Sequence, residues 1–328
     1  MITRRNVLLA GGSGLLAAHP FVRAQPVPAV RRVGWLSFGS ESNVAILYAP
    51  LKQGMEGLGW REGKNVEYRI VYANSDSSRL DILARDLVGQ RVDVILVGNG
   101  QSAFAAQRAT KTIPIVMAGL ANAMGTGLVA GLAKPGGNVT GLTSQQDELL
   151  GKVIGILHEV APGARRIAIL LNEHNPPHAL FWAAAQGACA ASDLVPQRVV
   201  ASTPEQLGAA VEQIVQQRAQ AIVVTSDALY FTERAKLQDL MQATRLPVAY
   251  ELRDHVLAGG LLSYGYDTAA TYRDAATYID KVLKGARPAD LPIEQTTKFK
   301  LVINVKTAKA LGLTIPQSLL LRADEVIQ

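Results

Sequence analysis

Residues 91–97, RVDVILV, form an apolar run of strand length that ends at the polar turn GNG of residues 98–100. Residues 218–224, RAQAIVV, repeat this pattern. A segment of helix length follows each run, and then a second short apolar run, IPIV at 113–116 or LPVA at 246–249. Buried strands of parallel sheets are nearly continuous in apolar residues. The two stretches therefore predict two similar α/β units.

On both sides of these two stretches, apolar runs alternate with amphipathic segments of helix length. This alternation is typical of parallel sheets covered on both faces. Expected strands lie at 33–38, 66–71, 92–97, 113–117, 167–171, 195–200, 221–224 and 247–250. Expected helices between them include 43–58, 102–109, 179–191 and 232–244. A last helix at 269–283 and a last segment at 299–305 must join these sheets. The predicted fold class is α/β, with two similar doubly wound parallel-sheet lobes joined by several chain crossings.

Composition fits two lobes and excludes several function classes. The 328 residues are about twice a typical domain of ~150. Hydrophobic residues make up 48%, which suffices for a sizeable core, and aromatics are only 5%, which disfavours a surface for base stacking. The single cysteine, Cys189, excludes a disulfide within the chain and a cysteine-based zinc site.

The N-terminus reads as an export signal. Residues 3–9, TRRNVLL, resemble a twin-arginine motif, and residues 7–18 are a run of small and apolar residues. Residues 22–24, VRA, fit the small-x-small cleavage rule, so residues 1–24 are expected to be a signal peptide cleaved after Ala24, with the mature protein in the periplasm. A membrane anchor is the alternative, but a helix needs ~20 apolar residues to cross a bilayer. Cleavage leaves 30 basic and 27 acidic residues, too weak a positive excess for nucleic-acid binding.

The sequence contains segments that resemble cofactor and metal sites, but their positions do not fit those functions. Residues 125–131, GTGLVAG, look like a dinucleotide loop but follow the fourth expected strand rather than the first. No phosphate-binding loop or nucleophile elbow is present, so no cofactor and no enzyme activity are expected. His174 and His178 have the spacing of a helical metal pair, but Pro176 and Pro177 break that helix, so we expect both histidines on a loop surface and no metal.

Candidate ligand contacts follow the expected strands, because ligands of open parallel sheets bind beyond the carboxyl ends of the strands. A helix starting near Ser102 suits a carboxylate. Asp227 and Glu251 suit an ammonium, and Tyr250 and Tyr264 suit an apolar wall. Together these groups predict a zwitterion such as an amino acid. The full set of candidates is Ser40, Asn99, Gly100, Gly119, Asn122, Asn172, Asp227, Tyr250, Glu251 and Tyr264.

Several candidates also have a simpler explanation. Ser40 and Asp227 are suitable helix caps, and Gly100 can simply end a strand. Tyrosines such as Tyr250 are more often packed than exposed, and Glu251 can be an ordinary solvated charge.

Four longer segments identify a family. They are ATYIDKVLKGARPADLP at 276–292, KTAKALGLTIP at 306–316, KPGGNVTGL at 134–142 and GGLLSYG at 259–265. The chain from about Arg32 to its end resembles the substrate-binding proteins of ABC transporters, in the branch that includes tryptophan- and tyrosine-binding proteins. The resemblance implies the type I periplasmic-binding-protein fold, with lobe 1 at 31–142 plus 265–296, lobe 2 at 143–264 plus 297–328, and lobe crossings near Thr143, Tyr264 and Thr297.

The resemblance also implies a function. The expected protein is a monomeric receptor that captures a small polar ligand, an amino acid or related carboxylate, by hinge closure and delivers it to a membrane permease with its ATPase subunit. Two departures leave the ligand open: residues 121–123 are Ala-Asn-Ala where the family usually has Gly-Asp-Pro or Ala-Asp-Pro, and Asn172-Glu173 stands where it has Asn-Pro. The alternatives are a periplasmic sensor for a signalling partner and an α/β enzyme. Ligand turnover by the purified protein favours the enzyme.

Overall fold

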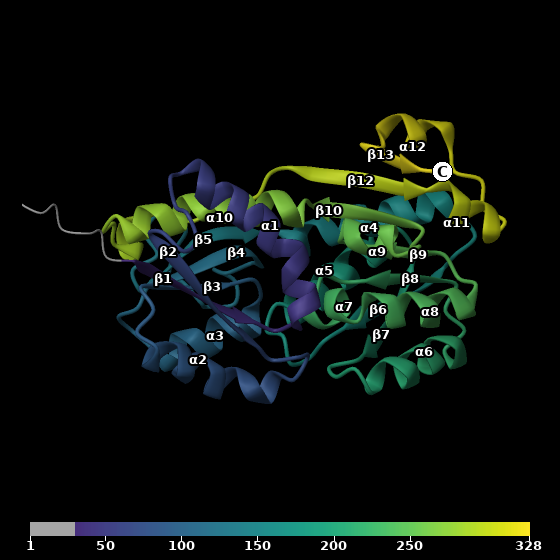
Figure 1. Ribbon diagram of the computed structural model, residues 1–328. Helices are drawn as coiled ribbons and strands as arrows, with labels where there is room; N and C mark the ends of the chain where they lie inside the picture. The colour runs from purple at the N-terminus through teal and green to yellow at the C-terminus, as the bar shows by residue number, and fades with distance from the viewer. Residues whose placement is uncertain (1–29) are drawn as a thin grey trace, which may run out of the picture.

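A computed structural model describes residues 30–328, so the expected signal peptide lies outside the described residues. Two lobes, each built on its own sheet, stand side by side (Figure 1). The first sheet has the strand order β11-β5-β4-β3-β1-β2, and all its pairs are parallel. Its strands are β1 (Arg31–Ser37), β2 (Val66–Tyr72), β3 (Val94–Val97), β4 (Ile115–Ala121), β5 (Val139–Ser144) and β11 (Glu294–Gln295).

The second sheet has the order β13-β12-β10-β9-β8-β6-β7. Its strands are β6 (Arg166–Leu171), β7 (Val195–Val200), β8 (Ala221–Val224), β9 (Val248–Tyr250), β10 (Leu262–Tyr266), β12 (Phe299–Asn304) and β13 (Glu325–Ile327). One pair departs from the predicted parallel arrangement, because β12 returns antiparallel to β10. The prediction of two α/β lobes built on largely parallel sheets is confirmed.

Helices cover both faces of each sheet (Figure 1). In the first lobe α1 (Glu41–Gly57) packs on α10 (Thr268–Leu283), and α2 (Leu80–Gly89) packs on α3 (Gly100–Ala109). In the second lobe α4 (Gln146–Val160) packs on α5 (His178–Ala190), and α6 (Gln206–Gln216) packs on α8 (Arg234–Thr244). The short elements are η1 (Ser77–Arg79), η2 (Pro288–Asp290), α7 (Ala228–Thr232), α9 (Arg253–Leu257), α11 (Val305–Ala310) and α12 (Gln317–Arg322).

The apolar runs that predicted the strands are buried. All four residues of β3 and all four of β8 are buried, as expected for central strands covered on both faces. Trp35 of β1 is also buried. Burial of such surface stabilises the fold by ~25 cal/mol per Å². One buried hydrophobic cluster lies mostly in the first lobe and one in the second, and a third joins residues of both lobes.

The chain passes between the two lobes three times. It leaves the first sheet after β5 for α4, returns after β10 to α10, and leaves again between β11 and β12. The point at which each connection bends is not fixed by the sheets, so the boundaries of the moving lobes stay a prediction.

Two predicted helices differ in detail. Helix α3 begins at Gly100 rather than Ser102, because the Asn99 side chain accepts a hydrogen bond from the Ser102 N–H at 2.9 Å and caps the helix. The helix expected at 232–244 is interrupted at Glu233, which separates α7 from α8. Within residues 30–328, no helix combines the length and apolar character needed to span a bilayer.

Candidate ligand-binding site

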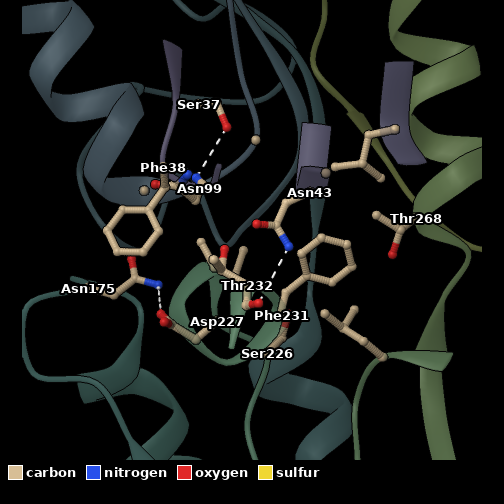
Figure 2. Close-up of a pocket in the computed structure, with 18 of the residues that line it drawn as sticks. Ser37, Phe38, Asn43, Asn99, Asn175, Ser226, Asp227, Phe231, Thr232 and Thr268 are labelled. Atoms are coloured by element: carbon tan, nitrogen blue, oxygen red, sulfur yellow. Dashed lines mark hydrogen bonds between the residues drawn. The ribbon is translucent and has the colours of Figure 1, made fainter. Parts of the chain in front are cut away.

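A cavity lies between the lobes, where the carboxyl ends of the central strands of both sheets meet. Its accessible interior volume is about 90 Å³. The first lobe contributes residues at the carboxyl ends of β1 and β4 and residues that follow β3, and the second contributes the loop before α5 and the segment after β8. Figure 2 shows the lining side chains converging from these segments.

The cavity has an aromatic wall. Its aromatic residues are Trp35, Phe38, Phe231, Tyr266 and Tyr272. The rings of Trp35 and Tyr272 lie 5.2 Å apart, a distance typical of favourable aromatic pairs. Such a wall suits an apolar or aromatic ligand body.

Glycine makes room for one of these rings. A β-carbon on Gly98 would lie 2.0 Å from the Tyr272 hydroxyl, so the ring can occupy its position only because residue 98 has no side chain.

Two helices begin at the cavity. Gly100 is the first residue of α3 and Thr268 the first of α10, and both line the cavity. The first N–H groups of a helix have no partner within the helix, and the helix dipole adds partial positive charge there. In α10 the Asp267 side chain caps only the Ala270 N–H, at 3.0 Å. These ends favour an anionic group such as a carboxylate.

A buried carboxylate, Asp227, anchors the second lobe's side of the cavity. Its side chain has no solvent exposure and accepts hydrogen bonds from the Asn172 amide at 3.0 Å, the Asn175 amide at 2.7 Å and the Leu229 N–H at 2.8 Å. His178 Nε2 lies 3.1 Å from its Oδ2. Burial alone would raise the pKa of Asp227, but these contacts hold the pKa below its ordinary value.

The position of His178 corrects a sequence-based expectation. We expected a loop surface, whereas His178 begins α5 and is buried. Its Nδ1 accepts the Asn172 N–H at 3.0 Å, so a neutral ring carries its proton on Nε2, facing Asp227. The prolines 176 and 177 precede the helix rather than interrupting it. No group of three or more metal-ligating side chains occurs in the part of the chain that the structure describes.

Three polar groups of the cavity lining have no hydrogen-bond partner among residues 30–328. They are Gln146 Nε2, Asn175 Oδ1 and Thr268 Oγ1. Gln146 Oε1 accepts from the Ser144 hydroxyl at 3.1 Å, which leaves the Gln146 nitrogen as a donor. Unpaired buried polar groups cost free energy, so these three are suited to a ligand.

The lobes touch at the mouth of the cavity. Asn43 Nδ2 of α1 lies 3.4 Å from the Thr232 carbonyl of α7, and the Ser75 hydroxyl donates to Glu233 Oε1 at 3.0 Å. A β-carbon on Gly100 would lie 2.8 Å from Asn175 Oδ1 across the gap. These contacts join the two lobes in this structure.

Four of the ten candidate residues line the cavity, namely Asn99, Gly100, Gly119 and Asp227. Asn172 is buried behind the cavity on Asp227. Ser40 lies at the outer mouth, where its hydroxyl donates to Asn43 Oδ1 at 2.6 Å. The Asn122 amide donates to Asp147 at 2.7 Å, away from the lining.

The other three candidates also lie outside the cavity lining. Tyr250 is buried, stacks on His255 at 4.8 Å and donates to Gln238 at 2.8 Å. Glu251 is buried and accepts the Ser226 N–H at 2.5 Å. The Tyr264 hydroxyl accepts from Lys152 at 2.6 Å. Direct ligand contact by any of the ten residues stays a prediction.

Sequence reasoning missed most of the lining. The lining residues that were not proposed as ligand contacts include Phe38, Asn43, Gln146, Asn175, Ser226, Phe231, Tyr266, Thr268 and Tyr272. Several had a usable signal, because Phe38, Ser226 and Tyr266 stand at the carboxyl ends of strands. Asn175 had a weaker one, its place three residues after Asn172 on the same loop.

The buried carboxyl group of Glu251 is expected to make the stability of the fold depend on pH. Burial raises the pKa of its carboxyl well above the ordinary value, so the folded protein keeps a proton that the unfolded chain releases above about pH 4.5. The stability that this group contributes is therefore lost as the pH rises from about 4.5 toward the raised pKa of the folded protein. Glu251→Gln, which keeps an acceptor for the Ser226 N–H, is expected to raise the free energy of unfolding more at pH 8 than at pH 5. Urea unfolding at both pH values measures this, and an equal effect at both would contradict it.

Comparisons with known proteins agree with this geometry. The profile of the family "ABC transporter substrate binding protein" matches residues 32–327. A "Tyrosine-binding protein" of Clostridioides difficile (strain R20291) is 24% identical over 261 residues, which cover 80% of this chain and 75% of that protein. The two lobes have the type I periplasmic-binding-protein fold.

Two solved structures superpose closely. An ABC domain from Streptococcus pneumonia in complex with L-Trp has a TM-score of 0.85 and 25% identity, over 91% of this chain and 100% of that one. A conserved domain protein from Vibrio cholerae has a TM-score of 0.85 and 24% identity, over 90% and 99% of the two chains. The family match spans nearly all described residues, and this chain belongs to the ABC transporter substrate-binding protein family.

Proposed function

We propose that this protein is the extracytoplasmic solute-binding component of an ABC importer. It captures a small polar ligand, an amino acid with an aromatic side chain or a related carboxylate, between its two lobes. One observation carries the proposal: a cavity between the lobes combines an aromatic wall with the N-termini of α3 and α10. The L-Trp complex of the pneumococcal relative and the name of the clostridial tyrosine-binding protein support this ligand class.

The proposed mechanism is hinge closure. Residues 31–142 plus 265–296 would move against 143–264 plus 297–328, about the three connections between the sheets. A ligand that contacts both lobes stabilises only the closed state and shifts the population toward it. The contacts Asn43 to Thr232 and Ser75 to Glu233 form in that state. A permease with its ATPase subunit would then receive the closed, monomeric protein in the periplasm, after removal of residues 1–24.

A thermal-shift screen tests the proposed function. The mature protein is heated with each of the twenty amino acids and with aromatic and aliphatic carboxylates. A ligand at a hundredfold excess over its Kd stabilises the folded state by ~2.7 kcal/mol, which raises the unfolding temperature by about 4 °C for a mature chain of ~300 residues. We expect such a shift for at least one member. No shift across the whole panel contradicts the proposed ligand class, and turnover of a bound member would favour the enzyme alternative.

A further inference from the structure

The amide of Asn175 is held in one orientation. Its Nδ2 donates to Asp227 Oδ2 at 2.7 Å, and a carboxylate oxygen can only accept there. Figure 2 shows the amide nitrogen turned toward Asp227 and the oxygen turned away, toward Phe38. Asn175 is 6% exposed, and its Oδ1 has no hydrogen-bond partner among residues 30–328. This position therefore presents an acceptor, and only an acceptor, to the cavity.

The other unpaired groups of the lining do not duplicate this acceptor. Gln146 presents its nitrogen, a donor, because its oxygen faces Ser144. The Thr268 hydroxyl can donate or accept, so it does not discriminate between ligands. Glu251 stands outside the lining. Among the three unpaired groups of the described lining, Asn175 Oδ1 is therefore the fixed acceptor.

Asp227 lines the cavity, but its carboxylate oxygens are buried against other donors and contact Asn175. Its side chain has no solvent exposure, and its oxygens already receive the Asn172, Asn175 and Leu229 donors, with His178 at 3.1 Å. A carboxylate that accepts from an amide N–H polarises that amide and strengthens its oxygen as an acceptor. In this way the negative charge of Asp227 makes Asn175 Oδ1 a stronger hydrogen-bond acceptor toward the cavity.

The acceptor lies beside the first residue of α3. A β-carbon on Gly100 would lie 2.8 Å from Asn175 Oδ1, so this oxygen faces the helix end suited to a carboxylate. An α-amino acid carries its ammonium and its carboxylate on the same carbon atom. Asn175 Oδ1 can accept a hydrogen bond from the ammonium while the N-terminus of α3 binds the carboxylate. A carboxylate ligand without an amino group would leave Asn175 Oδ1 unpaired.

We propose that Asn175 is the specificity-determining residue that reads the amino group of the ligand, and that Asp227 is the positioning residue that fixes the Asn175 amide for this task. This inference rests on the proposed function and narrows its ligand class to α-amino acids, against carboxylates of the same shape that lack the amino group.

Matched ligand pairs test the inference. Isothermal titration compares L-tryptophan with indole-3-propionate and L-phenylalanine with 3-phenylpropionate, and likewise each amino acid that binds with its des-amino acid. A hydrogen bond to a charged group contributes roughly 1.5–3 kcal/mol, so the wild type is expected to prefer the amino member by about 10-fold or more. In Asn175→Ala the preference is expected to fall below about threefold. Asp227→Asn, which frees the Asn175 amide to turn, is expected to lose preference as well.

Asn138→Ala is the control, because Asn138 donates to the Thr110 and Ile113 carbonyls, away from Asp227, and does not line the cavity. It is expected to keep the wild-type preference. Asn175→Leu, of similar shape, repeats the test, and near-UV circular dichroism verifies the fold of each variant. An undiminished preference in the Asn175 variants, or equal wild-type affinity for both members of a pair, overturns the inference while the proposed function stands. If no amino acid and no des-amino acid binds, both fail together.

Discussion

Placing a methyl group on Gly100 is expected to weaken ligand binding by about 10–100-fold, by opposing closure of the lobes. The added carbon would stand 2.8 Å from Asn175 Oδ1 and 3.3 Å from Pro177 Cδ, both on the opposite lobe. Asn175 cannot swing aside freely, because Asp227 holds its amide at 2.7 Å. The closed state then becomes a smaller fraction of the population, and the apparent Kd rises in proportion.

Folding should not suffer from this change. Gly100 does not have a left-handed backbone, and alanine is the better helix former. Gly208→Ala in α6 is the matched control, because nothing lies within 4 Å of its added carbon. Both variants should unfold at or above the wild-type temperature, and only Gly100→Ala should bind weakly in isothermal titration. Wild-type affinity in Gly100→Ala would show that the lobes do not meet at this point.

Removing the Asp227 carboxylate is expected to lower the free energy of unfolding by about 3–5 kcal/mol, because three buried donors lose their acceptor. Asp227→Ala leaves buried donors of Asn172, Asn175 and Leu229 without their acceptor. Each unpaired donor costs roughly 1–3 kcal/mol, offset in part by the charge that no longer needs burial.

Urea denaturation at pH 7 measures this effect. Asp81→Ala is the control, because Asp81 forms an exposed ion pair with Arg108 and such pairs contribute little. The pKa of Asp227 is lowered in the folded protein, so its contribution should be present at neutral pH and lost as pH falls through the acid range. A loss under 1 kcal/mol at pH 7 would mean that Asp227 does not organise this side of the cavity.

The fold was predictable because its strands carry a strong local signal. Central strands such as β3 and β8 are buried on both faces and therefore read as continuous apolar runs. The antiparallel return of β12 was not predictable, because a strand's direction depends on the path of the preceding connection rather than on its own residues.

The site was predictable only in part. The rule that ligands bind beyond strand ends placed Asn99, Gly100 and Asp227 at the cavity. The same rule failed to place Tyr250 and Glu251 there, because it selects a segment and not the direction of a side chain. Tyr250 turns into the second lobe to stack on His255, a contact between residues that only the folded loop brings together.

The aromatic wall shows a second limit. Tyr272 lies inside α10, four residues after that helix begins, and reaches the cavity because Gly98 leaves space for its hydroxyl. These residues are 174 positions apart in the sequence, so neither predicts the other's role. Pairings of this kind depend on tertiary packing.

A single distance measurement tests the central claim, that the lobes close over a solute held between them. Ser42 and Ala235 are exposed residues on opposite sides of the cavity mouth, and Ser42→Cys/Ala235→Cys carries two spin labels for pulsed electron resonance. Adding the tightest-binding solute of the screen should convert a long, broad distance distribution into a short, narrow one. The same distribution with and without saturating solute would contradict the account.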